Sequence, residues 1–238
     1  MTGERLYFRQ LLAGRDFAVG DPVALKMVNF VYLVGDREAG ECVVIDPAWG
    51  VRDLCDIAAE DGMKLTGALA THHHPDHVGG DLFGMTSIEG IATLLEHQGM
   101  KIHCHEAEHE WIRRGTGVSA SDLVGHGSGD VVDVGEIPIK LLHTPGHTPG
   151  SQCFLVENRL IAGDTLFLQG CGRTDFPGGD SEEMYRSLHE RLATLPDDTV
   201  LYPGHRYSPE ASAPLGETRG SNYVFNVAGL DDWRRLMS

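Results

Sequence analysis

The sequence predicts an α/β protein in which strands and helices alternate along a chain of 238 residues. Short runs of β-branched and apolar residues, bounded by turn residues, are typical of strands. Several segments between them carry apolar residues on one helical face, which is typical of helices packed on a sheet. The composition fits a soluble enzyme, because 41% of the residues are hydrophobic and no long apolar run is present. A chain of this length can bury one core or the cores of two packed half-domains.

The elements of the first half follow from local pattern. Residues 42–45 are β-branched up to Asp46-Pro47, which predicts a strand next to a strand at 28–34. Residues 51–60 predict a helix, because Leu54, Ile57 and Ala58 share one face. The apolar run 65–70 predicts a buried strand. The remaining elements expected here are helices at 88–98 and 106–114 and a strand at 101–104.

The second half is expected to form a second sheet. A glycine-rich stretch, 115–129, is predicted to join the halves. A helix is expected at 182–193, with Ser181 as its N-cap and Leu188 and Leu192 facing inward. The predicted strands are residues 131–134, 137–142, 152–156, 159–162 and 199–202.

The segment Thr71-His72-His73-His74-Pro75-Asp76-His77 carries the strongest functional signal. Imidazole and carboxylate are donor groups that first-row metals prefer. Alternate side chains of an extended backbone point the same way, so His72 and His74 share a side that His73 does not. Asp76 and His77 follow at the turn into the next element. The spacing therefore predicts two ligand pairs at two adjacent points, with His73 as a hydrogen-bonding bystander.

Three later motifs, taken with this segment, resemble those of the metallo-β-lactamase-fold superfamily. They appear in the expected order at 142–151, 163–167 and 201–205. The resemblance implies that His147, Asp164 and His205 are further metal ligands. It also implies an α/β (α+β) fold of four layers, αββα, with two central mixed sheets flanked by helices. The expected organisation is a single domain over 1–238, with half-domains at about 1–125 and 126–238.

Coordination chemistry then groups the ligands into two sites. His72, His74, His147 and Asp164 would make one site. Asp76, His77, His205 and the shared Asp164 would make the other, since a carboxylate can bridge two cations. Two cations about 3.5–4 Å apart can convert a water into a nucleophile near neutral pH. The nitrogen and oxygen donors suit two divalent ions, with zinc favoured and iron or manganese as alternatives.

The segment Gly170-Cys171-Gly172-Arg173 resembles one shared by glyoxalase II (hydroxyacylglutathione hydrolase) and persulfide dioxygenase. The following Thr174-Asp175-Phe176 is more similar to the dioxygenase and to small glyoxalase II-like proteins. Only 33 residues follow His205, so no full-length glyoxalase II C-terminal helical domain is expected. The position of Arg173 beyond Asp164 predicts substrate binding or support of a ligand, or a structural pair with a nearby carboxylate.

The resemblance implies a binuclear hydrolase of glyoxalase II type that cleaves a thioester of a small thiol with a metal-bound hydroxide. Asp76 is expected to be catalytic, because it would orient the nucleophile and accept its proton. The alternative is a persulfide dioxygenase that uses a single iron, held by one histidine of the first motif with His147 and Asp164. The acyl group, the thiol carrier and the oligomeric state leave no signature in the sequence.

Composition limits the partners. The formal charge of −16 argues against a nucleic-acid surface, which needs a basic stripe. No apolar run is long enough to span a membrane. Five scattered cysteines without a Cys-x-x-Cys pair, and a charged N-terminus, predict a cytoplasmic protein. The resemblance implies a small thiol-derived substrate.

Other candidate residues are expected to serve structure. Cys171 has no identifiable base beside it, so a structural thiol is expected rather than a nucleophile. The residues predicted to pack or to support the ligands, without binding metal, are His103, His105, His109, His143, Trp111 and Trp233.

Overall fold

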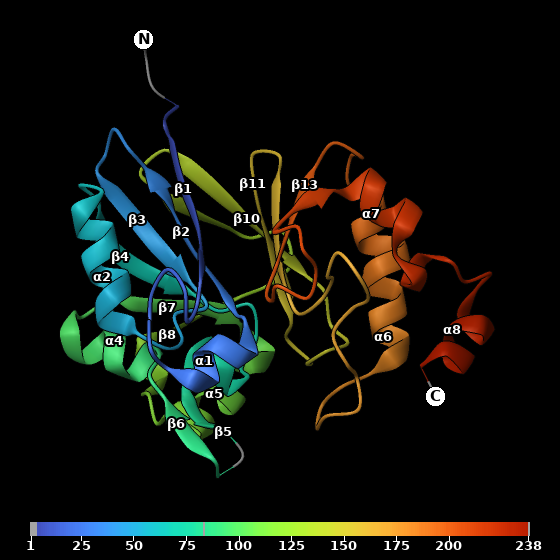
Figure 1. Ribbon diagram of the computed structural model, residues 1–238, viewed down its shortest axis with the longest axis horizontal. Coiled ribbons are helices and arrows are strands. Elements are labelled where there is room, and N and C mark those ends of the chain that lie inside the picture. The colour runs from blue at the N-terminus through green and yellow to red at the C-terminus, as the bar shows by residue number, and fades with distance from the viewer. Residues whose placement is uncertain (1–3, 83, 238) are drawn as a thin grey trace.

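Two mixed sheets lie face to face in the computed structural model, which describes residues 4–82 and 84–237 (Figure 1). The first sheet has the order β1-β2-β3-β4-β7-β8. Its strands β1 to β3 are antiparallel, whereas β3, β4, β7 and β8 run parallel. These strands are β1 (Leu6–Leu12), β2 (Phe30–Asp36), β3 (Glu41–Ile45), β4 (Lys64–Leu69), β7 (Lys101–His105) and β8 (Leu123–His126).

The second sheet has the order β14-β13-β12-β11-β10-β9, with β12 and β13 as its parallel pair. Its strands are β9 (Val131–Val134), β10 (Ile137–His143), β11 (Gln152–Val156), β12 (Arg159–Gly163), β13 (Val200–Pro203) and β14 (Ala213–Pro214). A separate hairpin pairs β5 (Gly80–Leu82) with β6 (Thr86–Ile88).

Helices cover the outer faces of both sheets (Figure 1). The helices of the first half are α1 (Pro22–Met27), α2 (Val51–Glu60), α3 (Pro75–Val78), α4 (Ile91–His97) and α5 (His109–Thr116). Those from the second half are α6 (Ser181–Arg186), which continues through a π-helical turn (Ser187–Arg191), α7 (Leu215–Ser221) and α8 (Leu230–Leu236). Among the described residues, no helix has the length and apolar character needed to cross a bilayer.

The helices and sheets form four layers, and an apolar cluster lies between each pair of adjacent layers. On β2, Tyr32 and Val34 face the second sheet, while Val31 and Leu33 face the helices, as the alternation of a strand requires. On β12, Ile161 belongs to the cluster between the sheets and Leu160 to the cluster beneath α6. The αββα architecture expected from the sequence is therefore confirmed.

Several predicted boundaries need correction. The helix expected at 88–98 begins only at Ile91, because the preceding residues form β6. Ser181 is the first residue of α6, and its N-cap is Asp180, whose side chain accepts hydrogen bonds from two backbone N–H groups of the first turn. The stretch 115–129 contains the edge strand β8 as well as connecting loops. Strand β1 and helices α7 and α8 were not predicted from the sequence.

Candidate metal centre

The histidine-rich segment begins where β4 ends and leads into the short helix α3. Pro75 is the first residue of that helix, a position where the missing N–H costs nothing. His74 before it is extended, with φ −64° and ψ 145°, as the residue before a proline prefers. The turn thus places Asp76 and His77 on a helical turn and leaves His72 and His74 on extended backbone.

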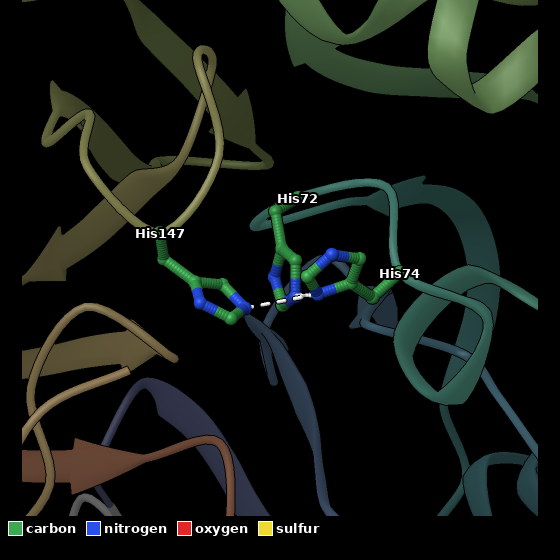
Figure 2. Close-up of side chains that lie close together, drawn as sticks. All are labelled: His72, His74 and His147. Atoms are coloured by element: carbon green, nitrogen blue, oxygen red, sulfur yellow. Dashed lines mark hydrogen bonds between the residues drawn. The ribbon is translucent and has the colours of Figure 1, made fainter. Parts of the chain in front are cut away.

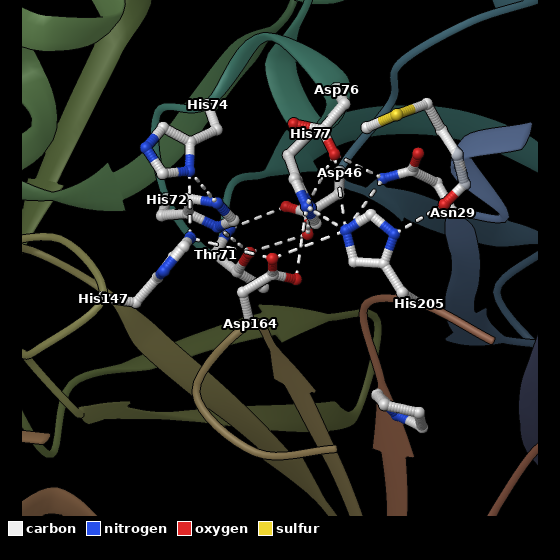
Figure 3. Close-up of polar contacts among 12 residues, drawn as sticks. Asn29, Asp46, Thr71, His72, His74, Asp76, His77, His147, Asp164 and His205 are labelled. Carbon is white, nitrogen blue, oxygen red and sulfur yellow. Dashed lines mark hydrogen bonds and ion pairs between the residues drawn. The ribbon is translucent and has the colours of Figure 1, made fainter. Parts of the chain in front are cut away.

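The other three predicted ligands follow strands of the second sheet. His147 lies in the loop after β10, Asp164 follows β12 and His205 follows β13. The structure brings all of the predicted ligands together at one edge of the two sheets (Figure 3). Their role in binding metal stays a prediction, since the structure tests position and not occupancy. They are His72, His74, Asp76, His77, His147, Asp164 and His205.

His72, His74 and His147 form the first cluster (Figure 2). The Nδ1 atom of His74 lies 3.1 Å from Nε2 of His72 and 2.9 Å from Nε2 of His147. Oδ2 of Asp164 lies 3.7 Å from the same atom of His147. Three ring nitrogens from two different halves of the chain therefore face one point, with a carboxylate beside it.

Asp76, His77 and His205 form the second cluster. The Nε2 atoms of His77 and His205 are 3.3 Å apart, and Oδ2 of Asp76 lies 3.3 Å from that of His205. Asp164 faces this cluster too, with Oδ1 3.3 Å from His77 Nε2 and Oδ2 3.4 Å from His205 Nε2. Donor atoms around one tetrahedral zinc are separated by about 3.3 Å. The observed spacing fits that of ligands sharing a cation.

Hydrogen bonds on the far side of the rings fix which nitrogen faces the centre. Nδ1 of His147 donates to the carbonyl of Arg173 at 2.7 Å, and Nδ1 of His205 donates to that of Met27 at 2.8 Å. Nδ1 of His77 donates to Asp46 at 2.9 Å. Each of these bonds places the ring proton on Nδ1 and leaves the Nε2 lone pair directed inward, as metal-binding histidines require.

Asp46 was not predicted as a site residue, although it orients both clusters. Its carboxylate accepts from the backbone N–H and the hydroxyl of Thr71, each at 2.7 Å, as well as from His77. The same hydroxyl accepts from Nδ1 of His72 at 3.0 Å. Asp46 has a positive φ of 56°, which is uncommon outside glycine. The sequence signal was Asp46-Pro47 at the end of a β-branched strand.

The electrostatics of the two clusters differ. Burial lowers the pKa of His74 to about 3 and also lowers the pKa of His72 and His147, so the first cluster offers neutral imidazoles. Burial likewise opposes the charged form of His77 and His205, but Asp76 and Asp164 outweigh it and raise the pKa of both rings. The second cluster therefore favours positive charge, which a proton or a cation can supply.

Asp164 provides a direct test of whether these residues fit a metal. Its Oδ1 atom is buried and has no hydrogen-bond donor. A buried carboxylate oxygen without a partner is costly unless a cation satisfies it. A Cβ added at Gly204 would lie 2.5 Å from this oxygen, so glycine keeps that space open. The orphaned oxygen and the inward lone pairs fit divalent ions at this centre.

A cavity of about 360 Å³ opens beside the clusters. His74, Asp76, His147, Asp164 and His205 line its floor. Its walls combine apolar groups with one arginine and one thiol; they include Met27, Leu82, Phe167, Phe176, Tyr207, Cys171 and Arg173. Tyr207 stacks on the His205 ring at 4.9 Å. The predicted ligands therefore face a space that can hold a small molecule with an apolar part.

Comparison with known families decides the classification. The sequence profile of the metallo-beta-lactamase superfamily matches residues 26–205, which include every predicted ligand. The chain belongs to the metallo-β-lactamase superfamily. Within it, the sequence expectation that both glyoxalase II and persulfide dioxygenase are relatives is confirmed.

Three superfamily members illustrate the relationship. The mitochondrial persulfide dioxygenase ETHE1 of Mus musculus is 33% identical over 86% of this chain and 77% of that protein. A hydroxyacylglutathione hydrolase of a Polaromonas species is 37% identical over 75% of this chain, but the match covers 62% of that protein. The crystal structure of ETHE1 from Myxococcus xanthus has a TM-score of 0.79 at 29% identity, covering 97% of this chain and 89% of that one.

Remaining candidate residues lie around this superfamily site. Cys171 lines the cavity, and burial raises the pKa of its thiol to about 12, which disfavours a thiolate nucleophile. His143 donates from Nε2 to the carbonyl of Pro149 and stacks on His105. Among the described residues, the groups spaced to hold a metal draw only on the seven predicted ligands and include none of His103, His105 and His109.

Arg173 lies on the cavity wall with its side chain paired to Asp175. Two hydrogen bonds of 2.7 and 2.6 Å join the guanidinium to that carboxylate. The guanidinium also lies 4.2 Å from the ring centre of Phe176, whose edge contacts His74. Its backbone carbonyl is the acceptor that holds His147. The pair with Asp175 matches the structural role that the sequence allowed for Arg173. Arg173 contacts the predicted ligand His147 through its backbone carbonyl and not through its side chain.

We expect Arg173→Lys to fold and to keep much of its metal while losing at least about tenfold in kcat/KM. The reason is that lysine cannot reproduce the two-point contact with Asp175 or the stacking on Phe176. Asp175→Asn, which weakens the same pair from the other side, should lower kcat/KM in the same direction. Steady-state kinetics of the folded, metal-loaded variants would check this. Unchanged kcat/KM in Arg173→Lys would remove Arg173 from the active site.

Proposed function

We propose that this protein is a persulfide dioxygenase that acts on a small thiol persulfide with a single iron at the first cluster. His72, His147 and Asp164 would hold the iron, because two histidines and one carboxylate with open positions are the ligand set of non-heme iron oxygenases. The observation that carries the proposal is the similarity to persulfide dioxygenases, which extends over 86% of the chain in sequence and 97% in structure. This favours the alternative from the sequence over the thioester hydrolase.

The local structure of the segment 174–176 supports the dioxygenase over glyoxalase II. Thr174-Asp175-Phe176 resembles the dioxygenase, and Phe176 lies on the cavity wall with its ring centre 5.6 Å from that of His74. The cavity lining also includes the apolar side chains of Met27, Leu82 and Phe167. Such a lining can pack the carbon chain of a thiol and exclude water from the reacting sulfur.

The overall reaction balances without a further cofactor. A persulfide, dioxygen and water give the thiol and sulfite with release of protons; the terminal sulfur is oxidised and dioxygen is reduced. Bound iron would supply the redox chemistry that activates dioxygen. The protein holds the ligand rings through Thr71, Asp46 and the Arg173 carbonyl. Asp76 lines the cavity and would act as the proton acceptor.

A binuclear thioester hydrolase is the second candidate, and one observation favours it. The second cluster is fully assembled, with Asp76, His77 and His205 at mutual distances of 3.3–3.6 Å. In that case Asp164 would face both metals and Asp76 would orient the attacking water. The dioxygenase would use three of the seven predicted ligands and one cation, whereas the hydrolase would use all seven and two cations.

Metal analysis combined with two activity assays distinguishes the dioxygenase from the hydrolase. The protein would be produced with both iron and zinc in the medium, then analysed for metal by mass spectrometry. Oxygen uptake with glutathione persulfide and hydrolysis of S-lactoylglutathione would be measured on the same sample. We expect one iron per chain and oxygen uptake coupled to sulfite formation. Two metals per chain, thioester hydrolysis and no oxygen uptake would replace the dioxygenase with the hydrolase.

A further inference from the structure

Glu108 is a fully buried acid that neither candidate reaction uses. It ends a short 3₁₀ turn, Glu106–Glu108, between β7 and α5, and none of its surface is exposed. A buried carboxylate is costly unless each oxygen is hydrogen-bonded. The hydrogen bonds that stabilise this buried carboxylate therefore indicate its role.

The two carboxylate oxygens of Glu108 bind different halves of the chain. Oε2 accepts from Nδ1 of His73 at 2.5 Å. Oε1 accepts from the hydroxyl of Thr148 at 2.9 Å and from the backbone N–H of Gly150 at 2.6 Å. A Cβ at Gly150 would lie 2.6 Å from Cγ of Glu108, so the second loop approaches the acid as closely as glycine permits.

The partners of Glu108 flank the first cluster. His73 stands between His72 and His74, and Thr148 directly follows His147. The His73 ring is also fixed from its face, because it stacks on Trp111 at 4.8 Å with an angle of 19°. The loop on the other side is closed by the Ser151 hydroxyl, which lies 2.7 Å from that of Thr148.

The second cluster is anchored by a different set of contacts. His77 is held by Asp46, and His205 by the carbonyl of Met27. Asn29 donates to Oδ2 of Asp76 at 3.1 Å. None of the contacts described for Glu108 reaches these residues, so a change at Glu108 acts first on the cluster formed by His72, His74 and His147.

We propose that Glu108 is a positioning residue that joins the two ligand loops of the first cluster and thereby sets its affinity for metal. One carboxylate fixes the loop from the first half and the loop from the second half at the same time. This holds the three ring nitrogens at the 2.9–3.1 Å spacing seen in the structure. The inference is independent of the reaction, because both candidate functions use the first cluster.

The test is the metal affinity of Glu108→Gln, measured by competition with a chelator of known affinity, using Co²⁺ as the probe. The amide keeps the size of the side chain but offers one acceptor oxygen, so one loop loses its partner. Groups that orient metal ligands typically contribute about 10–100-fold in metal affinity. We expect a loss in that range at the first cluster, together with an altered visible spectrum of the bound Co²⁺.

Asp36→Asn is the matched control. Asp36 is also fully buried and also joins the halves, because it accepts from the Arg5 guanidinium and from the backbone N–H of Glu136. It has no contact with the ligand loops in the structure. We expect a lower Tm in this variant with the Co²⁺ affinity and spectrum of the wild type. An equal loss of Co²⁺ affinity in both variants would show a general effect of loosened halves and overturn the proposal.

Thr148→Val keeps the test decisive if Glu108→Gln does not fold. It removes one hydroxyl donor to Glu108 and leaves the size of the side chain nearly unchanged. We expect weaker Co²⁺ binding in the same direction as for Glu108→Gln. Wild-type Co²⁺ affinity and spectrum in either folded variant, Glu108→Gln or Thr148→Val, would overturn the role of Glu108.

Discussion

Asp164→Ala is expected to lower metal binding at both clusters and to reduce kcat by at least about a thousandfold, since removing a metal from the reacting centre removes its chemistry. The structural reason is that the carboxylate faces both sites. Oδ1 lies 3.3 Å from His77 and Oδ2 lies 3.4 Å from His205 and 3.7 Å from His147. Metal content per chain and turnover would be measured on the same preparation.

Asp164→Asn is the companion variant. Its amide keeps an oxygen but loses the negative charge, so it should retain more metal than the alanine variant and less than the wild type. The Tm of metal-free protein would be compared to separate loss of ligand from loss of fold. Full metal occupancy with normal turnover in Asp164→Ala would rule out a bridging role for this carboxylate.

His147→Ala and His205→Ala are expected to behave differently, and the contrast reports the number of working metals. His147 belongs to the first cluster and His205 to the second. His147→Ala should reduce turnover by at least about a thousandfold under either proposed function, because the first cluster holds the required metal in both. His205→Ala should leave one tightly bound metal and most of the turnover in a mononuclear dioxygenase. A binuclear hydrolase would instead lose most of its turnover.

Metal content and kinetics of the two histidine variants decide this point together. Both rings are almost fully buried, and each is held by a main-chain carbonyl, so the structural cost of removing them is similar. Each of the two variants therefore serves as a folding control for the other. Severe loss in both variants would favour the hydrolase, whereas activity that survives in His147→Ala would place the chemistry outside the first cluster.

The sequence predicted those parts of the fold that local pattern determines. Helix α2 was predicted with its observed bounds, because its apolar residues repeat on one face. Strands β9 and β11 were also predicted with their observed bounds. Strand β1 was missed because its position depends on pairing with β2 across the fold. The start of α6 was predicted one residue late because Asp180 and Ser181 are both suitable caps, and only the backbone determines which of them caps the helix.

In the site, too, some residues were predicted from local pattern and others were not. The residues predicted to bind metal were found by their spacing and order, and the structure places their donor atoms together. The residues that orient them were not found. Asp46 acts on Thr71 and His77, which are 25 and 31 residues away, and Glu108 acts on Thr148 and Gly150, 40 and 42 residues away. The Asp46 contacts lie within the first half and the Glu108 contacts to Thr148 and Gly150 cross to the second. Both depend on tertiary packing of segments far apart in the sequence, which no local sequence pattern records.

The predicted ligands come from both halves of the chain, and this arrangement would tie the folded state to the supply of metal. A cation held by His72 from the first half and by His147 and Asp164 from the second would act as a cross-link that only the native state can form. By mass action, metal present at about a thousand times its Kd adds about 4 kcal/mol to the free energy of unfolding. Loss of metal would then abolish activity and also shorten the lifetime of the protein. The metal-free protein would unfold more often and expose backbone that proteases can cleave.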